Sequence, residues 1–181
     1  MKSRLKRGLL LTLVAVFFVA SPTFAQAGPT MTDTHIARVR ANCQAALITL
    51  EQIHANDAPA YINRNQTYFS ISDKLMARLN SRLTLNRYDA TQLVRTASDY
   101  NTELTKFRAV YKTYDNAMTD ALKTNCKKEP ANFYERVSAA REARLSVKES
   151  VDQLTTLLVQ YQQQVKQFQE KHFSDQVEAK R

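Results

Sequence analysis

Glycine is missing from almost the whole chain, and this absence limits the available folds more than any other feature. The only two glycines of the 181 residues are Gly8 and Gly28, and only Pro59 and Pro130 interrupt the sequence beyond Pro29. Tight hairpins and sharp loops need residues that tolerate positive φ, chiefly glycine. A β-rich or α/β domain of this size would be very unusual, so the sequence predicts few, long helices.

The N-terminal segment has the pattern of a secretory signal peptide. Four basic residues lie within the first seven positions, and an uncharged apolar run from Gly8 to Ala20 follows directly. Small residues then offer cleavage after Ala25 or after Ala27. The alternative is an uncleaved membrane anchor, which would need ~20 predominantly apolar residues. Because the apolar run is shorter, we expect cleavage and an extracytoplasmic location in the periplasm, at the cell surface or outside the cell.

This pattern divides the chain into four parts. We expect a signal peptide over 1–25, a flexible N-terminus over 26–31, a helical coiled-coil domain over 32–173 and a basic or polar tail over 174–181. Removal of the four basic residues of the signal peptide lowers the formal charge of +9 to +5. Such a mild excess permits weak attraction to anionic polymers, lipids or nucleic acid but specifies none of them.

Apolar residues recur every 3.5 residues on average through the last third of the chain. This is the heptad spacing of helices that wrap around one another. Pro130 stands at the natural first-turn position of this helix. Only Arg144 and His172 are polar in the seam, which consists of Phe133, Val137, Ala140, Arg144, Val147, Val151, Leu154, Leu158, Tyr161, Val165, Phe168 and His172.

The middle third carries the same spacing. Asp89 is an N-cap residue type, and the predicted helix runs from there to Asn125, before the loop that precedes Pro130. Its seam consists of Leu93, Ala97, Tyr100, Leu104, Phe107, Tyr111, Tyr114, Met118 and Ala121.

The first third is less regular, because the segment 54–59 separates two apolar stripes. The segment is either a loop or a proline kink in one helix that runs from about Thr32 to Asn86. One stripe consists of Ile36, Val39, Cys43, Ala46, Leu50 and Ile53, and the other of Tyr68, Ile71, Leu75, Leu79 and Leu83.

The two cysteines of the mature chain favour the kinked helix. Export leads to a compartment where disulfides persist, so we expect one bridge between Cys43 and Cys126. With a turn centred on Arg87, the two cysteines reach similar heights in antiparallel helices, whereas a reversal at Pro59 would separate them by tens of ångströms. The predicted fold is an all-α, elongated antiparallel three-helix coiled-coil bundle. A four-helix bundle with a break at Pro59 is the alternative.

Several short stretches resemble a group of secreted long-helix proteins encoded by ultrasmall candidate-phylum bacteria. They are the run Asn86 to Asp89, the region Tyr111 to Tyr114, Cys126 before Phe133, and the segment 140–147. The resemblance covers most of the mature chain and implies an architecture of long helices but no activity. The glycine that usually precedes the Tyr-Asp turn of this group is Arg87 here.

The sequence offers little chemistry for a catalytic site. The residues His35, His54 and His172 are far apart and have no neighbour at metal-ligand spacing. Phosphate loops and serine-hydrolase or zinc-protease motifs are absent from the sequence. Three narrow helices also leave little concave volume for a substrate. We therefore expect no enzyme, no cofactor, no metal and no small-molecule substrate.

One group of like charges stands out, because elsewhere in the predicted helices acidic and basic residues alternate. Lys74, Arg78 and Arg82 recur every four residues, so they share one helix face, which we call the basic ridge. Ion pairs with Asp99 and Glu103 of the next helix are the favoured explanation, and an anion-binding role is the alternative.

These features favour an interaction or structural protein of the cell envelope or extracellular space, which contacts protein partners or self-associates. A basic periplasmic-type holdase is a second interpretation, because such chaperones are also small, exported, cationic and helical. Weak binding of nucleic acid or anionic wall polymer by the basic ridge is a third, and it predicts a steep salt dependence. Membrane association is expected only if the signal segment is retained.

Overall fold

The computed structural model describes residues 31–178, and the side chains of residues 31–173. Every regular element in this part of the chain is helical, which confirms the all-α prediction. The expected signal peptide and the start of the expected flexible N-terminus lie outside the described residues. The elements are α1 (Asp33–Ala41), α2 (Cys43–Ser70), η1 (Ile71–Met76), α3 (Ala77–Leu85), α4 (Thr91–Lys123) and α5 (Pro130–Glu178).

The first third of the bundle forms one helical segment in which α2, η1 and α3 follow one another without a loop. Pro59 lies inside α2, so the chain does not reverse there. A break does occur earlier, at Asn42, where ψ is 9° and α1 is separated from α2. The hydroxyl of Thr32 accepts a hydrogen bond from the amide of His35, so helix formation starts at the expected position.

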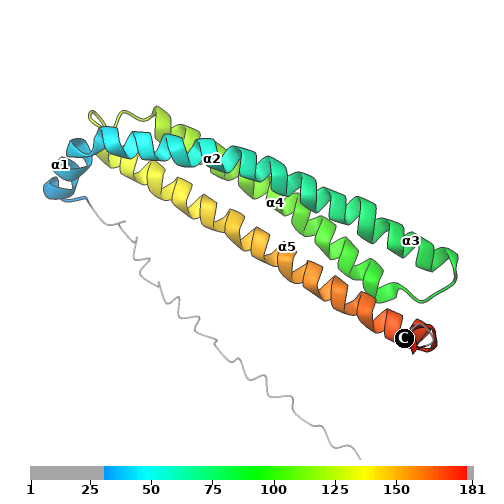
Figure 1. The fold of residues 1–181 in the computed structure, drawn as a ribbon. Helices are drawn as coiled ribbons and strands as arrows, with labels where there is room; N and C mark the ends of the chain where they lie inside the picture. The colour runs from blue at the N-terminus through cyan, green and yellow to red at the C-terminus, as the bar shows by residue number, and fades with distance from the viewer. Residues whose placement is uncertain (1–30, 179–181) are drawn as a thin grey trace, which may run out of the picture. The chain divides into compact units, whose positions relative to one another are not determined.

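The three long helical segments lie side by side (Figure 1). The segment α2–η1–α3 starts at the end of the bundle that holds Cys43. Helix α4 runs antiparallel to this segment, and α5 runs parallel to it. The backbones of α4 and α5 approach closely along their lengths, whereas α5 meets α2 mainly through side chains. Pro130 begins α5 as expected, and α5 continues to Glu178, past the predicted boundary at 173. The described residues include no helix that is both long and apolar enough to cross a bilayer.

The turn between α3 and α4 closes the first hairpin with a left-handed residue. Arg87 has a φ of 61°, the conformation in which glycine is usually found. The amide of Arg87 donates to the carbonyl of Thr84 and that of Tyr88 to the carbonyl of Leu83, each at 3.0 Å. This pair of bonds is a Schellman motif, and it explains why the helix ends here without a glycine. Helix α4 then begins at Thr91, whose amide donates to the carboxylate of Asp89.

The predicted seams form most of the core. In α4, every seam residue is buried except Tyr111, which is half-buried. In α5, the spacing predicts the buried Phe133, Ala140, Leu154 and Tyr161 but omits Ser150 and Leu157, which are also buried.

The apolar stripe predicted from Tyr68 to Leu83 is wrong at its central residue, Leu75. Leu75 is 62% exposed, and the buried residues of this region are Ser72, Met76 and Asn80 instead. The cause is η1, a π-helical segment whose wider turn accommodates an extra residue. The buried face therefore shifts by one position relative to the heptad spacing.

Candidate functional site

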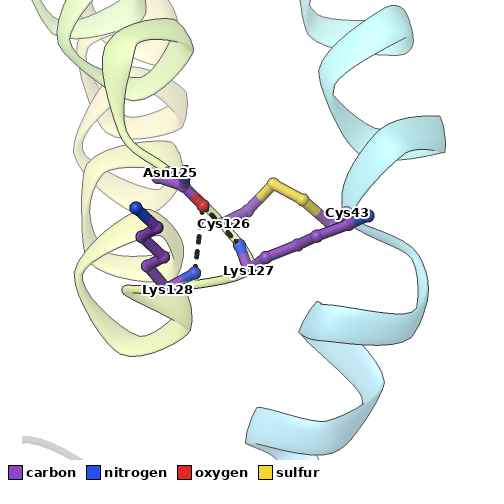
Figure 2. Close-up of a disulfide and its surroundings, with 5 residues drawn as sticks. All are labelled: Cys43, Asn125, Cys126, Lys127 and Lys128. Atoms are coloured by element: carbon purple, nitrogen blue, oxygen red, sulfur yellow. Dashed lines mark hydrogen bonds between the residues drawn. A yellow bond between two sulfur atoms is a disulfide. The ribbon is translucent and has the colours of Figure 1, made fainter.

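A disulfide joins the start of α2 to the loop before α5 (Figure 2). The Cα atoms of Cys43 and Cys126 are 5.5 Å apart, within the usual range for a disulfide. Both cysteines are buried, and they pack against Phe133 at the start of α5. The bridge predicted from the sequence is therefore present, and it fixes α2 beside α5 at this end of the bundle.

The loop that carries Cys126 is ordered by its neighbour Asn125. The side-chain oxygen of Asn125 accepts hydrogen bonds from the amides of Lys127 and Lys128, as Figure 2 shows. Its backbone carbonyl accepts a bond from the amide of Glu129. These bonds give the loop a fixed shape without glycine, because asparagine side chains replace backbone partners in turns.

Further along the bundle, the helices α2 and α5 border a cleft of about 420 Å³ with α4 as its floor. We call it the α2–α5 cleft. Small-molecule and side-chain binding sites commonly have volumes of ~300–1,000 Å³. The expectation that three helices leave little concave volume is therefore wrong for this bundle. The reason is that long side chains, rather than close backbones, bridge α2 and α5.

One wall of the cleft is organised around the carboxylate of Asp57. Arg144 of α5 donates to both oxygens of Asp57, from Nε at 2.8 Å and from a terminal nitrogen at 3.0 Å. The hydroxyl of Tyr114 of α4 donates to the same carboxylate at 2.6 Å. This cluster ties the three long helical segments together at one height.

The partners of Asp57 also control its protonation. Burial alone would raise the pKa of Asp57, but the hydrogen bonds from Arg144 and Tyr114 and the charges of Arg144 and Arg64 together lower it below its ordinary value. Burial and the bond to Asp57 raise the pKa of Tyr114. At neutral pH, Asp57 is therefore a carboxylate whose charge Arg144 already balances.

The floor of the cleft is aromatic. The rings of Tyr61 and Tyr111 are stacked, with centroids 3.6 Å apart and an interplanar angle of 5°. Phe107 lies against Tyr61 at 5.4 Å and is itself almost fully buried. Leu145, which is 55% exposed, adds an apolar side chain at the rim. Such a surface favours a large apolar group in contact with rings.

The rim of the cleft carries an excess of positive charge. Its lining includes four cations, Arg64, Arg141, Arg144 and Lys148, but only the carboxylates Asp57 and Asp152. Arg144 binds Asp57, and Lys148 pairs with Asp152. Within the described part of the chain, Arg64 and Arg141 form neither ion pairs nor side-chain hydrogen bonds. The cleft therefore has two unpaired cations available for a ligand.

A second hollow lies between α3 and α4. Its volume is larger, at about 850 Å³, but its lining carries fewer distinctive chemical groups. Its lining has no charged side chain and consists mainly of small and polar residues, among them Ala77, Ser81 and Ser98. It offers volume without a group that would select a ligand. The α2–α5 cleft is therefore the better candidate site.

The basic ridge does not form the ion pairs that we expected. Lys74, Arg78 and Arg82 are all exposed, and each lies two residues after a buried residue of η1 or α3, on the outward face. Glu103 instead accepts a hydrogen bond from Ser150 at 2.6 Å and pairs with Lys106 of its own helix. Among residues 31–173, the ridge cations take part in no ion pair.

The three histidines have separate environments. Nε2 of His54 lies 2.7 Å from a carboxylate oxygen of Asp115 and links α2 to α4. His172 packs against Tyr88 and Phe168 near the α3–α4 turn. In the described residues, no three His, Cys, Asp or Glu side chains are grouped closely enough to hold a metal ion.

Sequence reasoning missed the α2–α5 cleft. It treated the segment 54–59 as a kink or loop, so Asp57 received no role, and it noted Arg144 only as a break in an apolar seam. That break was the available signal, because a charged residue at a seam position needs a partner of opposite charge nearby. The height that places Asp57 beside Arg144 depends on α2 being continuous through Pro59.

Comparison with known proteins gives no further guide. No protein-family model matches the sequence, and no curated protein or solved structure matches it. The function is therefore argued from the geometry of the bundle and its cleft.

Proposed function

We propose that this protein is an exported, non-catalytic interaction protein of the cell envelope or extracellular space, and that it holds a partner protein in the α2–α5 cleft. The observation that carries the proposal is the combination of two unpaired cations, Arg64 and Arg141, with a stacked aromatic floor. Surfaces rich in arginine and tyrosine are typical of the centres of protein interfaces. The bridged α2 and α5 provide a preorganised frame for such a surface.

The location outside the cytoplasm is supported by the buried cystine, because disulfides persist in oxidising compartments. The signal-peptide pattern adds to this support. Intact mass or N-terminal sequencing of the exported protein tests the location. We expect the mature chain to start at Gln26 or Gly28. A mass that includes residues from Met1 onward would contradict cleavage and indicate an anchored protein.

Partner capture with matched charge variants tests the role of the cleft. The bait is the oxidised mature chain, and the sample is an envelope extract of the source cells. The cleft variant is Arg64→Gln with Arg141→Gln, and the control is Arg78→Gln with Arg82→Gln on the basic ridge. Each pair removes two exposed positive charges from helices, so both baits have the same net charge.

We expect a defined partner to be retained by the wild type and by the ridge control and to be lost by the cleft variant. Equal capture by all three baits would contradict the cleft as the interaction site. Capture of many unrelated unfolded proteins by all three would indicate the holdase interpretation instead.

The exposed basic ridge favours a second candidate function, the binding of anionic polymer. Lys74, Arg78 and Arg82 are free of ion pairs among residues 31–173, so they are available for phosphate or sulfate groups. Binding through phosphate contacts weakens steeply as salt rises. Duplex DNA titrated at two salt concentrations tests this function with the same variants. The ridge variant should then lose binding and the cleft variant should keep it, the reverse of the result expected for the protein partner.

A further inference from the structure

The cleft has its unpaired cations at opposite ends. Helices α2 and α5 run in the same direction, and the ion pair between Asp57 and Arg144 fixes their relative height. Arg64 lies seven residues after Asp57, and Arg141 lies three residues before Arg144. At ~1.5 Å per helical residue, the Cα atoms of Arg64 and Arg141 are about 15 Å apart along the bundle axis. Two carboxylates at a similar spacing therefore match the two cations better than a single one does.

The region between these cations holds the Asp57–Arg144 ion pair and, on the side toward Arg64, an aromatic surface. The stacked rings of Tyr61 and Tyr111 and the adjacent Phe107 form the floor at this height. Asp57, one of the two carboxylates that line the cleft, is already held by Arg144 and Tyr114, so it repels an incoming anion less than a free carboxylate would. A matching ligand therefore has two separated negative charges and a large apolar group between them.

We infer that the α2–α5 cleft recognises an extended acidic segment of a partner polypeptide, in which two carboxylate side chains flank an aromatic or large aliphatic residue. An extended chain rises ~3.3 Å per residue, so residues four positions apart are separated by about 13 Å. Flexible arginine side chains cover the remaining difference. This spacing favours a sequence of the form acidic, any, apolar, any, acidic. The inference rests on the proposed function, since it names the chemistry of the partner that the cleft holds.

Four synthetic probes separate the two parts of this recognition. The full probe is the capped pentapeptide Glu-Ala-Phe-Ala-Glu. One matched peptide replaces both glutamates by glutamine, and another replaces the phenylalanine by alanine. The fourth probe is 3-phenylpropanoate, a free small anion with the same ring and a single carboxylate. Each is titrated into the oxidised mature chain, and amide chemical shifts of α2, α4 and α5 are followed by NMR.

We expect the full peptide to shift amides in 57–64, 107–114 and 141–152 at lower concentration than any other probe. Loss of both carboxylates or of the ring should weaken binding by roughly tenfold or more, because each removes one of the two recognised features. Arg64→Gln and Arg141→Gln should each weaken the full peptide by roughly fivefold. Arg141→Lys should restore most of the binding, and the ridge variant Arg78→Gln should leave it unchanged.

Three results would overturn the inference. They are equal binding of the neutral and acidic peptides, equal binding of the free anion and the full peptide, and an equal effect of Arg78→Gln and Arg141→Gln. An equal effect of the two arginine substitutions would indicate non-specific charge attraction. Equal binding of the free anion and the full peptide would indicate a site for small anions. If partner capture depends on the cleft while these peptides fail to bind, the inference fails and the proposed function stands. If capture does not depend on the cleft, the proposed function fails, whatever the peptides do.

Discussion

The two sides of α5 pack in different ways. On one side, the backbone of α5 lies close to α4, and small side chains such as Ala140 and Ser150 are fully buried between them. On the other side, α5 meets α2 through side chains, among them the ion pair of Arg144 with Asp57, while the two backbones stay farther apart. The α2–α5 cleft is the consequence of this second arrangement.

The difference between the two sides of α5 shows how a bundle of three helices can form a binding site. Close packing of small and apolar residues supplies stability but leaves no room for a ligand. One charged residue in an otherwise apolar seam changes the local spacing, because its charge must remain near a partner of opposite charge and near water. In this chain the stable interface and the candidate site therefore share one helix and face different neighbours.

Removal of the disulfide should produce the largest effect and should act mainly on the α2 side. Cys43 and Cys126 are separated by 83 residues, and closure of such a loop stabilises a fold by about 4 kcal/mol on the chain-entropy estimate. Cys43→Ser and Cys126→Ser should therefore lower the free energy of unfolding by similar amounts. Urea denaturation measures this loss. Hydrogen exchange should accelerate more in α2 than in α4.

An equal acceleration of exchange in α2 and α4 would show that α2 is not the more loosely held helix. A control is the double variant Cys43→Ser with Cys126→Ser, which should be no less stable than either single variant by more than about 0.5 kcal/mol. Thiol titration of the unfolded, unreduced wild type should find no free thiol. Two free thiols would contradict the bridge itself.

A pair of leucine truncations compares the two faces of α5 directly. Leu154 is 1% exposed in the core, and Leu145 is 55% exposed at the rim of the cleft. Leu154→Ala should lower the free energy of unfolding by about 3 kcal/mol, because it removes buried methyl groups and leaves a cavity. Leu145→Ala should cost less than about 0.5 kcal/mol. Similar losses for the two variants in urea denaturation would show that the rim packs as tightly as the core.

The sequence was enough to predict the helices, because glycine is absent after Gly28 and apolar spacing is regular. It was also enough to predict the bridge, because the heights of Cys43 and Cys126 about a turn at Arg87 agree only for a continuous first helix. Regular spacing failed at Leu75, since a π-helical segment inserts one residue and moves the buried face. The local pattern gives no sign of that insertion, which lies where η1 packs against α4.

The candidate site was harder to predict than the fold. Its members come from three helices, and their meeting depends on the relative heights of α2 and α5, which heptad spacing alone leaves undetermined. Arg144 gave a signal, but its partner could be any carboxylate at a similar height. Only the three-dimensional arrangement selects Asp57 and adds Tyr114 as a second donor.

Substitution of Asp57 tests whether its ion pair with Arg144 stabilises the contact between α2 and α5. Asp57→Asn should lower the free energy of unfolding by about 1–2 kcal/mol at pH 7, because a charge-assisted pair and the bond to Tyr114 are weakened. The folded-state pKa of Asp57 lies below its ordinary value of 3.8, so its stabilisation is fully present above that value. The stabilisation is lost as the pH falls from about 4 through the folded pKa. The difference between wild type and variant in urea should therefore shrink below pH 4, and a constant difference would contradict the electrostatic explanation.

A small gain in stability is expected at the turn that ends the α2–η1–α3 segment. Arg87 has a φ of 61°, and a non-glycine residue in this region costs roughly 1 kcal/mol relative to glycine. Arg87→Gly should therefore stabilise the folded state by up to about 1 kcal/mol, less the greater chain entropy that glycine gives the unfolded state. Thermal and urea denaturation measure the net gain, and Arg87→Ala is the control that removes the charge but keeps the Cβ atom.

Hydrogen exchange would show which helices this gain in stability reaches. If the α2–η1–α3 segment opens as a separate unit, a stronger turn should slow hydrogen exchange in α3 more than in the middle of α5. If the whole bundle opens together, both should slow equally. Arg87→Gly should leave the α2–α5 cleft unchanged, because the turn follows α3 and Asp57 lies in α2, so about 45 Å of helix separates them. The variant therefore separates the stability of the first hairpin from the geometry of the site, and a shift of the cleft amides would show that the two are coupled.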